Sequence, residues 1–293
     1  MHKLALKYLL SLKHFNKAYR YIINPFVSFI PENILIRLPV NDIFSVNCKN
    51  GQKLLLNSNG YDAVANHIYW KGIDSGYESE TISVFIKLLR HSHIFFDIGA
   101  NTGIYSLIAA LNNNPITVHS FEPVPFIFQH LNENISLNKL TNVFTYAIAL
   151  SNFDGQTELF VPKGILPTSA STLKGFMEPA QIKDVIMAQA MKLDTFVKQF
   201  NVGRVDLLKI DTEGTEDHVI RGALNLIEDS KPVIICEILR RDEMQTITDI
   251  LGKFDYAFFH ITDRGLLPNN FEEQSIHKNY LFIANSQLFK LEP

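Results

Sequence analysis

The stretch 94–106, IFFDIGANTGIYS, constrains the fold more than any other part of this 293-residue chain. An apolar run leads into Asp97, a turn of small residues follows from Gly99 to Gly103, and a helical apolar pattern begins directly afterwards. This order of strand, tight turn and helix is that of a nucleotide-binding βα unit, where glycine brings bare backbone N–H groups close to a ligand. The dinucleotide pattern G-x-G-x-x-G is absent, because Asn101 takes the place of its second glycine. We therefore predict a site for a nucleoside-like cofactor, not one built to bind a pyrophosphate.

A second acidic residue, Glu122, directly follows the β-rich run Ile116–Phe121. It falls about one βαβ step after Asp97, where an acidic residue commonly holds a ribose. A carboxylate accepts hydrogen bonds at both oxygens, and a ribose offers adjacent hydroxyl groups, so the match is bidentate. The alternative is a charge that merely ends a strand before a turn. The spacing favours the ribose interpretation.

Four motifs in one order resemble those of class I S-adenosylmethionine-dependent methyltransferases, and specifically of the FkbM family. They are FFDIGANTGIYS, SFEPVP, the pair Leu193-Asp194, and LKIDTEGTEDHVIRGA, within a region from about Glu78 to Tyr280. The resemblance implies O-methylation, often of sugar or natural-product hydroxyls, and a cofactor-facing role for Glu78. It also implies that S-adenosylmethionine is held by Asp97, Gly99, Asn101, Gly103, Glu122 and Ala149.

The pattern from Ile94 onward alternates between strand and helix, which predicts an α/β fold. We expect a Rossmann-like, doubly wound, mostly parallel seven-stranded sheet with an antiparallel closing strand. The expected strands are Ile94–Ile98, Ile116–Phe121, Val143–Leu150, Val205–Asp211, Pro232–Glu237, Tyr256–Ile261 and Tyr280–Ala284. Residues 152–193 interrupt the alternation with short strands and a polar loop that carries Ser169, Ser171 and Thr172. This insertion is either a flap on the substrate side or an ordinary edge hairpin.

The chain divides into an N-terminal extension, residues 1–77, and a methyltransferase domain, residues 78–293. The extension is expected to hold a strand pair within Ile43–Leu56 and a helix over Asp62–Trp70. Its first 30 residues have helical apolar spacing, and the first acidic residue of the chain is Glu32. Basic residues recur through this segment at Lys3, Lys7, Lys13, Lys17 and Arg20. It is either a helix that binds a membrane surface or a partner, or a lid helix packed on the domain.

The candidate catalytic residues are Lys209, Asp211, Glu213 and Glu237. Side chains alternate along a strand, so Lys209 and Asp211 point to one face, and a lysine within an apolar parallel strand needs a partner. In one mechanism, desolvation lowers the pKa of this lysine and makes it the base. In another, Asp211 and Glu213 ligate Mg²⁺ or Mn²⁺, with Glu237 or His260 completing the site. In a third, the cluster only holds the structure together. His260 is also the candidate substrate contact, and Glu216 is a minor candidate ligand.

Composition narrows the function further. A net charge of -3 provides no global basic field, so nucleic acid is not an expected partner. Cys48 and Cys236 lie far apart without metal-type spacing, which favours a reducing compartment, and no apolar run reaches the length of a bilayer span. We expect a cytoplasmic enzyme with a small-molecule or glycan acceptor. Contact of residues 1–30 with the inner membrane surface is the alternative to a lid helix packed on the domain. N- or carboxyl methylation and a catalytically silent cofactor-binding protein are the alternatives. An NAD-dependent oxidoreductase is disfavoured by the missing glycine pattern.

Overall fold

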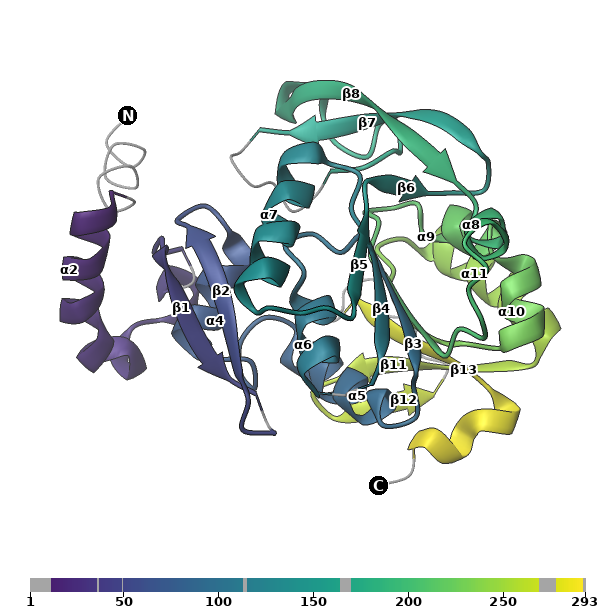
Figure 1. The fold of residues 1–293 in the computed structure, drawn as a ribbon, viewed down its shortest axis with the longest axis horizontal. Helices are drawn as coiled ribbons and strands as arrows, with labels where there is room; N and C mark the ends of the chain where they lie inside the picture. The colour runs from purple at the N-terminus through teal and green to yellow at the C-terminus, as the bar shows by residue number, and fades with distance from the viewer. Residues whose placement is uncertain are drawn as a thin grey trace.

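A large mixed sheet runs through the middle of the molecule (Figure 1). The computed structural model describes residues 12–35, 37–48, 50–112, 115–163, 170–268 and 278–291. In these ranges the large sheet has eight strands in the order β12-β11-β13-β10-β9-β3-β4-β5. Their bounds are β3 Ile94–Ile98, β4 Thr117–Phe121, β5 Val143–Tyr146, β9 Leu207–Ile210, β10 Val233–Glu237, β11 Tyr256–Thr262, β12 Gly265–Pro268 and β13 Asn279–Ala284.

The strand directions confirm the predicted doubly wound sheet. Strands β5, β4, β3, β9 and β10 are parallel, and β13 pairs antiparallel with both β10 and β11. The chain winds outward from β3 in one direction to β4 and β5, and in the other to β9 and β10. Such a switch point leaves a crevice at the carboxyl ends of the strands, where ligands bind in open α/β sheets. The eighth strand, β12, forms a short hairpin with β11 that the apolar pattern did not predict.

Helices cover both faces of the sheet because neighbouring strand residues point to opposite sides. Phe95 belongs to one buried cluster with residues of α4 to α7, whereas Phe96 belongs to another with residues of α8 to α11. The helices are α5 Ser79–Leu89, α6 Ile104–Asn112, α7 Pro125–Leu137, α8 Leu193–Gln199, α9 Glu216–Arg221, α10 Leu224–Ser230 and α11 Arg241–Leu251. Short 3₁₀ segments are η2 Pro179–Gln181, η3 Gly252–Phe254 and η4 Asn285–Leu291.

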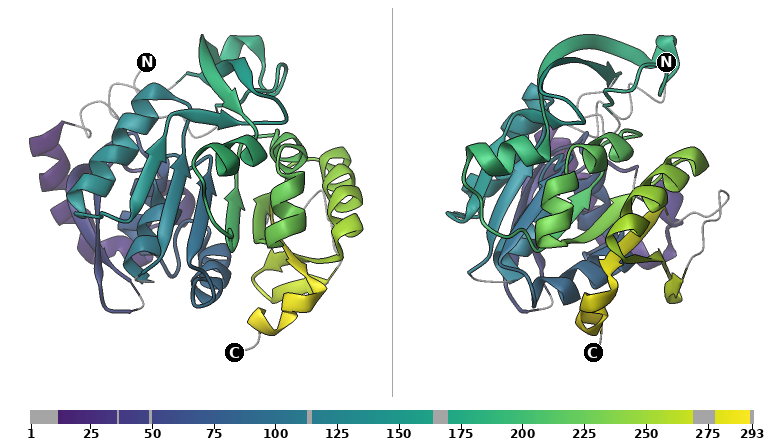
Figure 2. Two further views of the ribbon diagram at one scale, coloured as in Figure 1. Left: turned by 45° about the vertical axis from the view of Figure 1, so that its right-hand side comes forward. Right: turned by 90° about the vertical axis from the view of Figure 1, so that its right-hand side faces the viewer.

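The insertion forms a sheet of its own. The expected strand Val143–Leu150 is broken after Tyr146, and its last part becomes β6, Ile148–Leu150. Strand β6 joins β8, Ile182–Met191, which pairs antiparallel with β7, Gly155–Pro162. This hairpin lies above the large sheet in both views of Figure 2. Ser169 lies outside the described residues.

The N-terminal extension is packed against the sheet domain. It contains α2 Lys13–Ile23, η1 Asn24–Phe29, α3 Glu32–Leu35, β1 Asn41–Asn47, β2 Lys53–Asn59 and α4 Ala63–Lys71. The predicted strand pair is confirmed, since β1 and β2 are antiparallel. Asn134 of α7 and Asn138, which caps the C-terminus of that helix, bind the free edge of β2. The Oδ1 atoms of Asn138 and Asn134 accept hydrogen bonds of 2.8 and 2.9 Å from the N–H groups of Leu55 and Asn57. These asparagines lie one helical turn apart and therefore face the same strand.

Candidate active site

The turn after β3 adopts backbone conformations that few residues tolerate. Gly99 has φ +77°, and a Cβ there would lie 1.8 Å from the carbonyl oxygen of Asp211, so glycine is required. Asn101 also has a left-handed backbone, with φ 48°, which asparagine tolerates better than most side chains. The turn therefore accepts an asparagine at the position where the dinucleotide pattern has its second glycine. At Gly103, a Cβ would lie 2.5 Å from Leu131 of α7.

Asp97, in β3, connects the strand to the start of α6 by hydrogen bonds. Its side chain is buried, and its Oδ2 atom accepts hydrogen bonds from the backbone N–H and the hydroxyl of Ser106, at 2.9 and 2.5 Å. Burial raises the pKa of Asp97 to about 6, against the opposing effect of the Ser106 hydrogen bond. Among the described residues, Asp97 and Lys209 line a small pocket beside the two larger ones. The contacts of Asp97 therefore fix the start of α6.

Glu122 links the ends of two strands. Its Oε2 atom accepts a hydrogen bond of 3.0 Å from the N–H of Asn101, and its Oε1 atom accepts one of 2.9 Å from the N–H of Val124. Each carboxylate oxygen has a further lone pair, so Glu122 keeps acceptor capacity toward the pocket that it lines. Burial raises the pKa of Glu122 to about 7.

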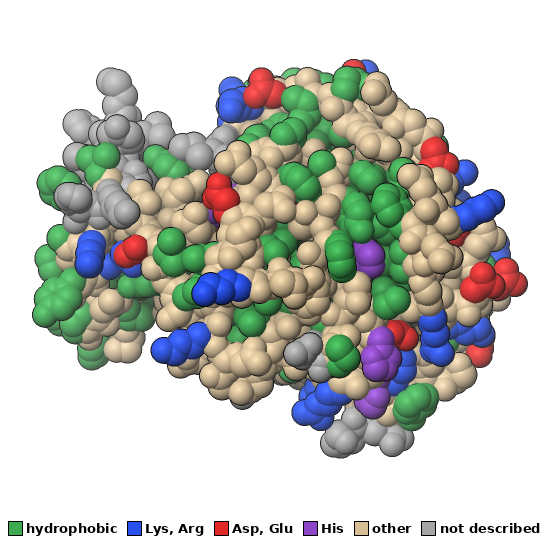
Figure 3. Space-filling view, in the orientation of Figure 1, with side chains coloured by type: hydrophobic (Ala, Val, Ile, Leu, Met, Phe, Trp, Pro, Cys, Tyr) green, Lys and Arg blue, Asp and Glu red, His purple; other side chains and the backbone are tan. Residues whose placement is uncertain are grey.

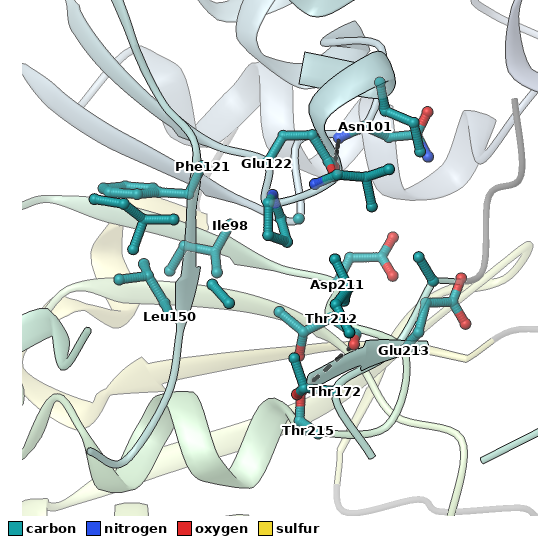
Figure 4. A pocket seen from close by; sticks show the side chains of 18 residues that line it. Ile98, Asn101, Phe121, Glu122, Leu150, Thr172, Asp211, Thr212, Glu213 and Thr215 are labelled. Atoms are coloured by element: carbon teal, nitrogen blue, oxygen red, sulfur yellow. Dashed lines mark hydrogen bonds between the residues drawn. The ribbon is translucent and has the colours of Figure 1, made fainter. Parts of the chain in front are cut away.

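A pocket of about 560 Å³, the first pocket, opens at this edge of the sheet. Figure 4 shows an apolar end formed by Ile98, Phe121 and Leu150, and a polar end where Glu122 and Asp211 lie. The remaining lining residues are Gly99, Asn101, Pro123, Val124, Ile127, Ile148, Ala149, Leu159, Ala170, Thr172, Thr212, Glu213 and Thr215. Ala170 and Thr172 come from the insertion, so the insertion contributes a wall of the pocket.

Glu216 organises the loop after β9, a role that the sequence analysis missed. Its Oε1 atom accepts a hydrogen bond of 2.6 Å from the N–H of Thr212, and its Oε2 atom accepts one of 3.0 Å from the N–H of Gly214. The loop places Glu213 at φ 59°, and the Ser171 hydroxyl donates a hydrogen bond of 2.7 Å to the Glu213 carbonyl oxygen. In the sequence, this loop is visible only as an acidic residue four positions after Thr212.

A second pocket of about 970 Å³ adjoins the first. The two share Gly99, Asn101, Asp211 and Glu213, so they meet at the ends of β3 and β9. The rest of the lining is Glu237 together with Arg37, Ala63, Val64, His67, Tyr77 and Glu78. Arg37, His67 and Tyr77 were not predicted, because the N-terminal extension carries no motif that marks them.

Lys209 is buried at the junction, with a side-chain exposure of 1%. Its Nζ atom lies 3.4 Å from Oδ2 of Asp211 and 5.2 Å from the centre of the Tyr105 ring. Burial alone would lower the pKa of Lys209, but the charges of Asp211, Glu78 and Glu237 outweigh burial and raise the pKa above its usual value. The expectation of a lysine with a lowered pKa was therefore wrong: Lys209 is held protonated.

Three carboxyl groups crowd around this lysine. One ligand atom each from Asp211, Glu213 and Glu237 lies within 4.8 Å of the others. The charge of Asp211 and burial raise the pKa of Glu237 to about 10, and burial and Asp211 raise the pKa of Glu213 to about 8. Like charges this close favour a shared proton or a bound cation.

Neighbouring side chains hold two other predicted residues, Glu78 by hydrogen bonds and His260 by ring stacking. The carboxylate of Glu78 accepts hydrogen bonds from the Tyr105 hydroxyl and, at 3.0 Å, from the side-chain amide of Asn279, and it lines the second pocket. His260 is buried in β11, where its ring stacks on Tyr280 with the centres 4.6 Å apart. It is not among the described residues that line either pocket.

Known proteins resemble the region that builds this site. The family model described as a methyltransferase FkbM domain matches residues 97–263. The chain is 27% identical over 157 residues to 31-O-demethyl-FK506 methyltransferase FkbM of Streptomyces tacrolimicus, covering 46% of this chain and 60% of that protein. It is 26% identical over 184 residues to the hexuronic acid methyltransferase AglP of Haloferax volcanii, covering 63% of this chain and 72% of that protein.

A solved structure is also similar: methyltransferase FkbM of Methylobacillus flagellatus aligns with a TM-score of 0.45 and 16% identity, over 66% of this chain and 43% of that one. The chain thus spans under two thirds of the Streptomyces protein and under half of the solved one. The family match covers more than half of the chain. It includes the end of β3 and all of β4, β9 and β10, whose ends form both pockets. This chain belongs to the FkbM family of methyltransferases.

Proposed function

We propose that the protein is an S-adenosylmethionine-dependent O-methyltransferase, and that its acceptor is a hydroxyl group of a sugar, glycan or natural-product-like molecule. The observation that carries this proposal is the group of carboxyl side chains at the junction of the two pockets. Asp211 and Glu213 line both pockets, so they lie where the proposed cofactor pocket meets the proposed acceptor pocket. The names of the relatives, which act on a demethyl-FK506 and on a hexuronic acid, support an oxygen acceptor.

The residues of the first pocket fit S-adenosylmethionine. Its apolar end suits a purine, and Glu122 retains lone pairs for the ribose hydroxyls. When bound, the cofactor supplies a methyl group on a positively charged sulfur. The carboxylates at the polar end of the pocket complement that charge, and Gly99 lines the pocket beside them.

The residues at the junction have distinct roles in the proposed mechanism. The second pocket would hold the acceptor hydroxyl, and Glu213 or Asp211 would take its proton as the methyl group passes from sulfur to oxygen and S-adenosylhomocysteine is left. A base with a pKa near neutral, such as Glu213, suits this transfer. Protonated Lys209 holds Asp211 by an ion pair of 3.4 Å, and Glu237 completes the carboxyl cluster.

A transfer assay tests the activity. Radiolabelled S-adenosylmethionine, incubated with fractionated glycans, lipids and small molecules, is expected to label a fraction with alkali-stable methyl groups. Label released by mild alkali would indicate a carboxyl methyl ester instead, and label on an amine would indicate N-methylation. Binding of S-adenosylhomocysteine without transfer into any fraction would support a catalytically silent protein.

The same assay separates the base mechanism from a metal mechanism. Asp211, Glu213 and Glu237 have the spacing of a divalent-cation site, so Mg²⁺ or Mn²⁺ is the second candidate for activating the hydroxyl. We expect the initial rate to be unchanged by EDTA, because the cluster can share a proton. Loss of activity with EDTA and recovery with Mg²⁺ or Mn²⁺ would show that the metal mechanism operates.

The pKa of Glu122 predicts how cofactor affinity depends on pH. Ribose binding needs the ionised carboxylate, and in the free protein burial raises the pKa of Glu122 to about 7. A proton must therefore leave before binding at lower pH, so the affinity for S-adenosylhomocysteine should fall about tenfold between pH 8 and pH 6. Calorimetry at both pH values measures this ratio.

The Glu122→Gln variant is the control for this pH effect, because other buried acids also titrate near the site. Its affinity should be lower than that of the parent at pH 8, and the tenfold pH dependence should be absent. A parent protein with equal affinity at both pH values would refute the ribose assignment.

We infer that the reaction takes place in the cytoplasm. Cys48 and Cys236 are buried, unpaired thiols, as in proteins of reducing compartments. The described helices include none long and apolar enough to cross a membrane.

A further inference from the structure

Helix α2 is attached to the protein by its polar side. Asn16 and Arg20, one turn apart, are its most buried described residues, at 0% and 6% exposure. The Asn16 side chain donates a hydrogen bond of 2.8 Å to the Pro39 carbonyl oxygen and accepts one of 2.9 Å from the N–H of Asn41. Arg20 forms an ion pair of 2.7 Å with Asp42. Polar contacts therefore fix the orientation of the helix.

The opposite side of α2 is apolar and faces solvent. Phe15 is 61% exposed, Tyr21 83% and Ile22 64%, and the exposure continues into η1 with Phe26 at 57% and Phe29 at 82%. A surface helix of a globular protein normally buries its apolar side. Here Tyr19 and Ile23 pack against the buried core, but Phe15, Tyr21 and Ile22 remain in solvent. Figure 3 shows hydrophobic side chains at the end of the molecule where Figure 1 places α2. These five side chains are called the docking face below.

The charges of the same segment identify the occupant. Residues 1–31 contain five lysines and arginines and no acidic residue, although the whole chain has a net charge of -3. Lys17, on α2, is exposed. Arg20 is paired with Asp42 on the opposite side of the helix, so Lys17 is the exposed cation among the described side chains of α2, and a second copy of the chain would bring the same cation to the contact. An anionic lipid surface complements both the cations and the aromatic side chains, which favour the boundary between lipid and water.

We propose that the docking face is a peripheral membrane anchor that inserts its aromatic side chains between anionic headgroups. The segment lies on the membrane rather than crossing it, because no described helix could span a bilayer. The anchor is independent of the catalytic residues, since none of its side chains lines either pocket.

Vesicle sedimentation of the full chain tests the anchor. The protein should pellet with vesicles of equal parts phosphatidylcholine and phosphatidylglycerol, stay largely in the supernatant with phosphatidylcholine alone, and be released by high salt. The double variant Tyr21→Ser/Phe29→Ser should bind at least about tenfold more weakly, a loss of ~1.4 kcal/mol. Lys17→Glu should weaken binding at low salt and have less effect at high salt.

The matched control is Val185→Ser/Met187→Ser on β8, where the two apolar side chains are 50% and 61% exposed but lie outside the docking face. This variant should bind vesicles like the parent, and thermal unfolding should show that all variants are folded. A parent protein that stays in the supernatant with anionic vesicles would overturn the proposal. If it is then a dimer that Tyr21→Ser/Phe29→Ser dissociates, a second copy covers the docking face instead.

Discussion

A Gly99→Ala variant is expected to lose both stability and cofactor binding. The added Cβ would lie 1.8 Å from the carbonyl oxygen of Asp211 and 2.8 Å from its carbonyl carbon. Both are backbone atoms, so the turn after β3 and the end of β9 must move apart. Overpacking and the left-handed backbone together should cost about 3 kcal/mol of folding free energy. Because these two strand ends form the floor of both pockets, affinity for S-adenosylhomocysteine should fall with stability.

Gly51→Ala is the matched control for this prediction. Gly51 has φ +79°, nearly the same as Gly99, but nothing lies within 4 Å of a Cβ built there. This variant carries the backbone strain without the clash, and it should lose only about 1 kcal/mol while binding the cofactor normally. Thermal unfolding and calorimetry compare the two. Equal behaviour of Gly99→Ala and Gly51→Ala would mean that the close approach to Asp211 is not essential.

The variants Asp211→Asn and Glu213→Gln are each expected to slow methyl transfer by about 10² to 10⁴, the usual contribution of acid–base groups. Both side chains reach the junction of the two pockets, where the acceptor proton must leave. An amide keeps the shape of the side chain but cannot accept that proton. Affinity for S-adenosylhomocysteine should change far less than the rate, because the ribose site at Glu122 is intact. Initial rates and calorimetry on the same preparations measure both.

Asp217→Asn is the control for these variants. Asp217 lies in the first turn of α9, pairs with Arg221 at 3.5 Å and is absent from the described lining of both pockets. Its variant should turn over like the parent. If Asp211→Asn and Glu213→Gln also remain within about threefold of the parent, less than 1 kcal/mol of barrier, the cluster is structural and the proton leaves by another route.

Local patterns were sufficient to predict the fold and the cofactor-side motif. The strand, turn and helix at 94–106 are adjacent in the chain, and the spacing from Asp97 to Glu122 is that of one βαβ step. The expected parallel strands are long apolar runs because both of their faces are buried. Such properties depend on neighbouring residues, which a sequence displays directly. The break after Tyr146 and the hairpin strand β12 were missed because short strands leave little periodicity.

Tertiary structure alone decided the chemistry around Lys209. A buried lysine read from its strand suggested a lowered pKa, but carboxylates from three separate segments surround it and reverse that shift. Sequence separation says nothing about these distances, and electrostatic effects depend on them. Arg37 and His67 could not be predicted for the same reason, that sequence separation does not show distance in space. They reach the second pocket because the extension packs beside the sheet.

The N-terminal helix shows most clearly what the sequence determines and what only the tertiary structure determines. Sequence alone established that residues 1–30 are basic and have an apolar helical face. The sequence left open whether that apolar face is buried. Periodicity shows which side chains lie on one side of a helix, but it does not show what that side contacts. The hydrogen bonds of Asn16 and the ion pair of Arg20 with Asp42 decide this: they hold the polar side against the protein and leave Tyr21 and Phe29 in solvent.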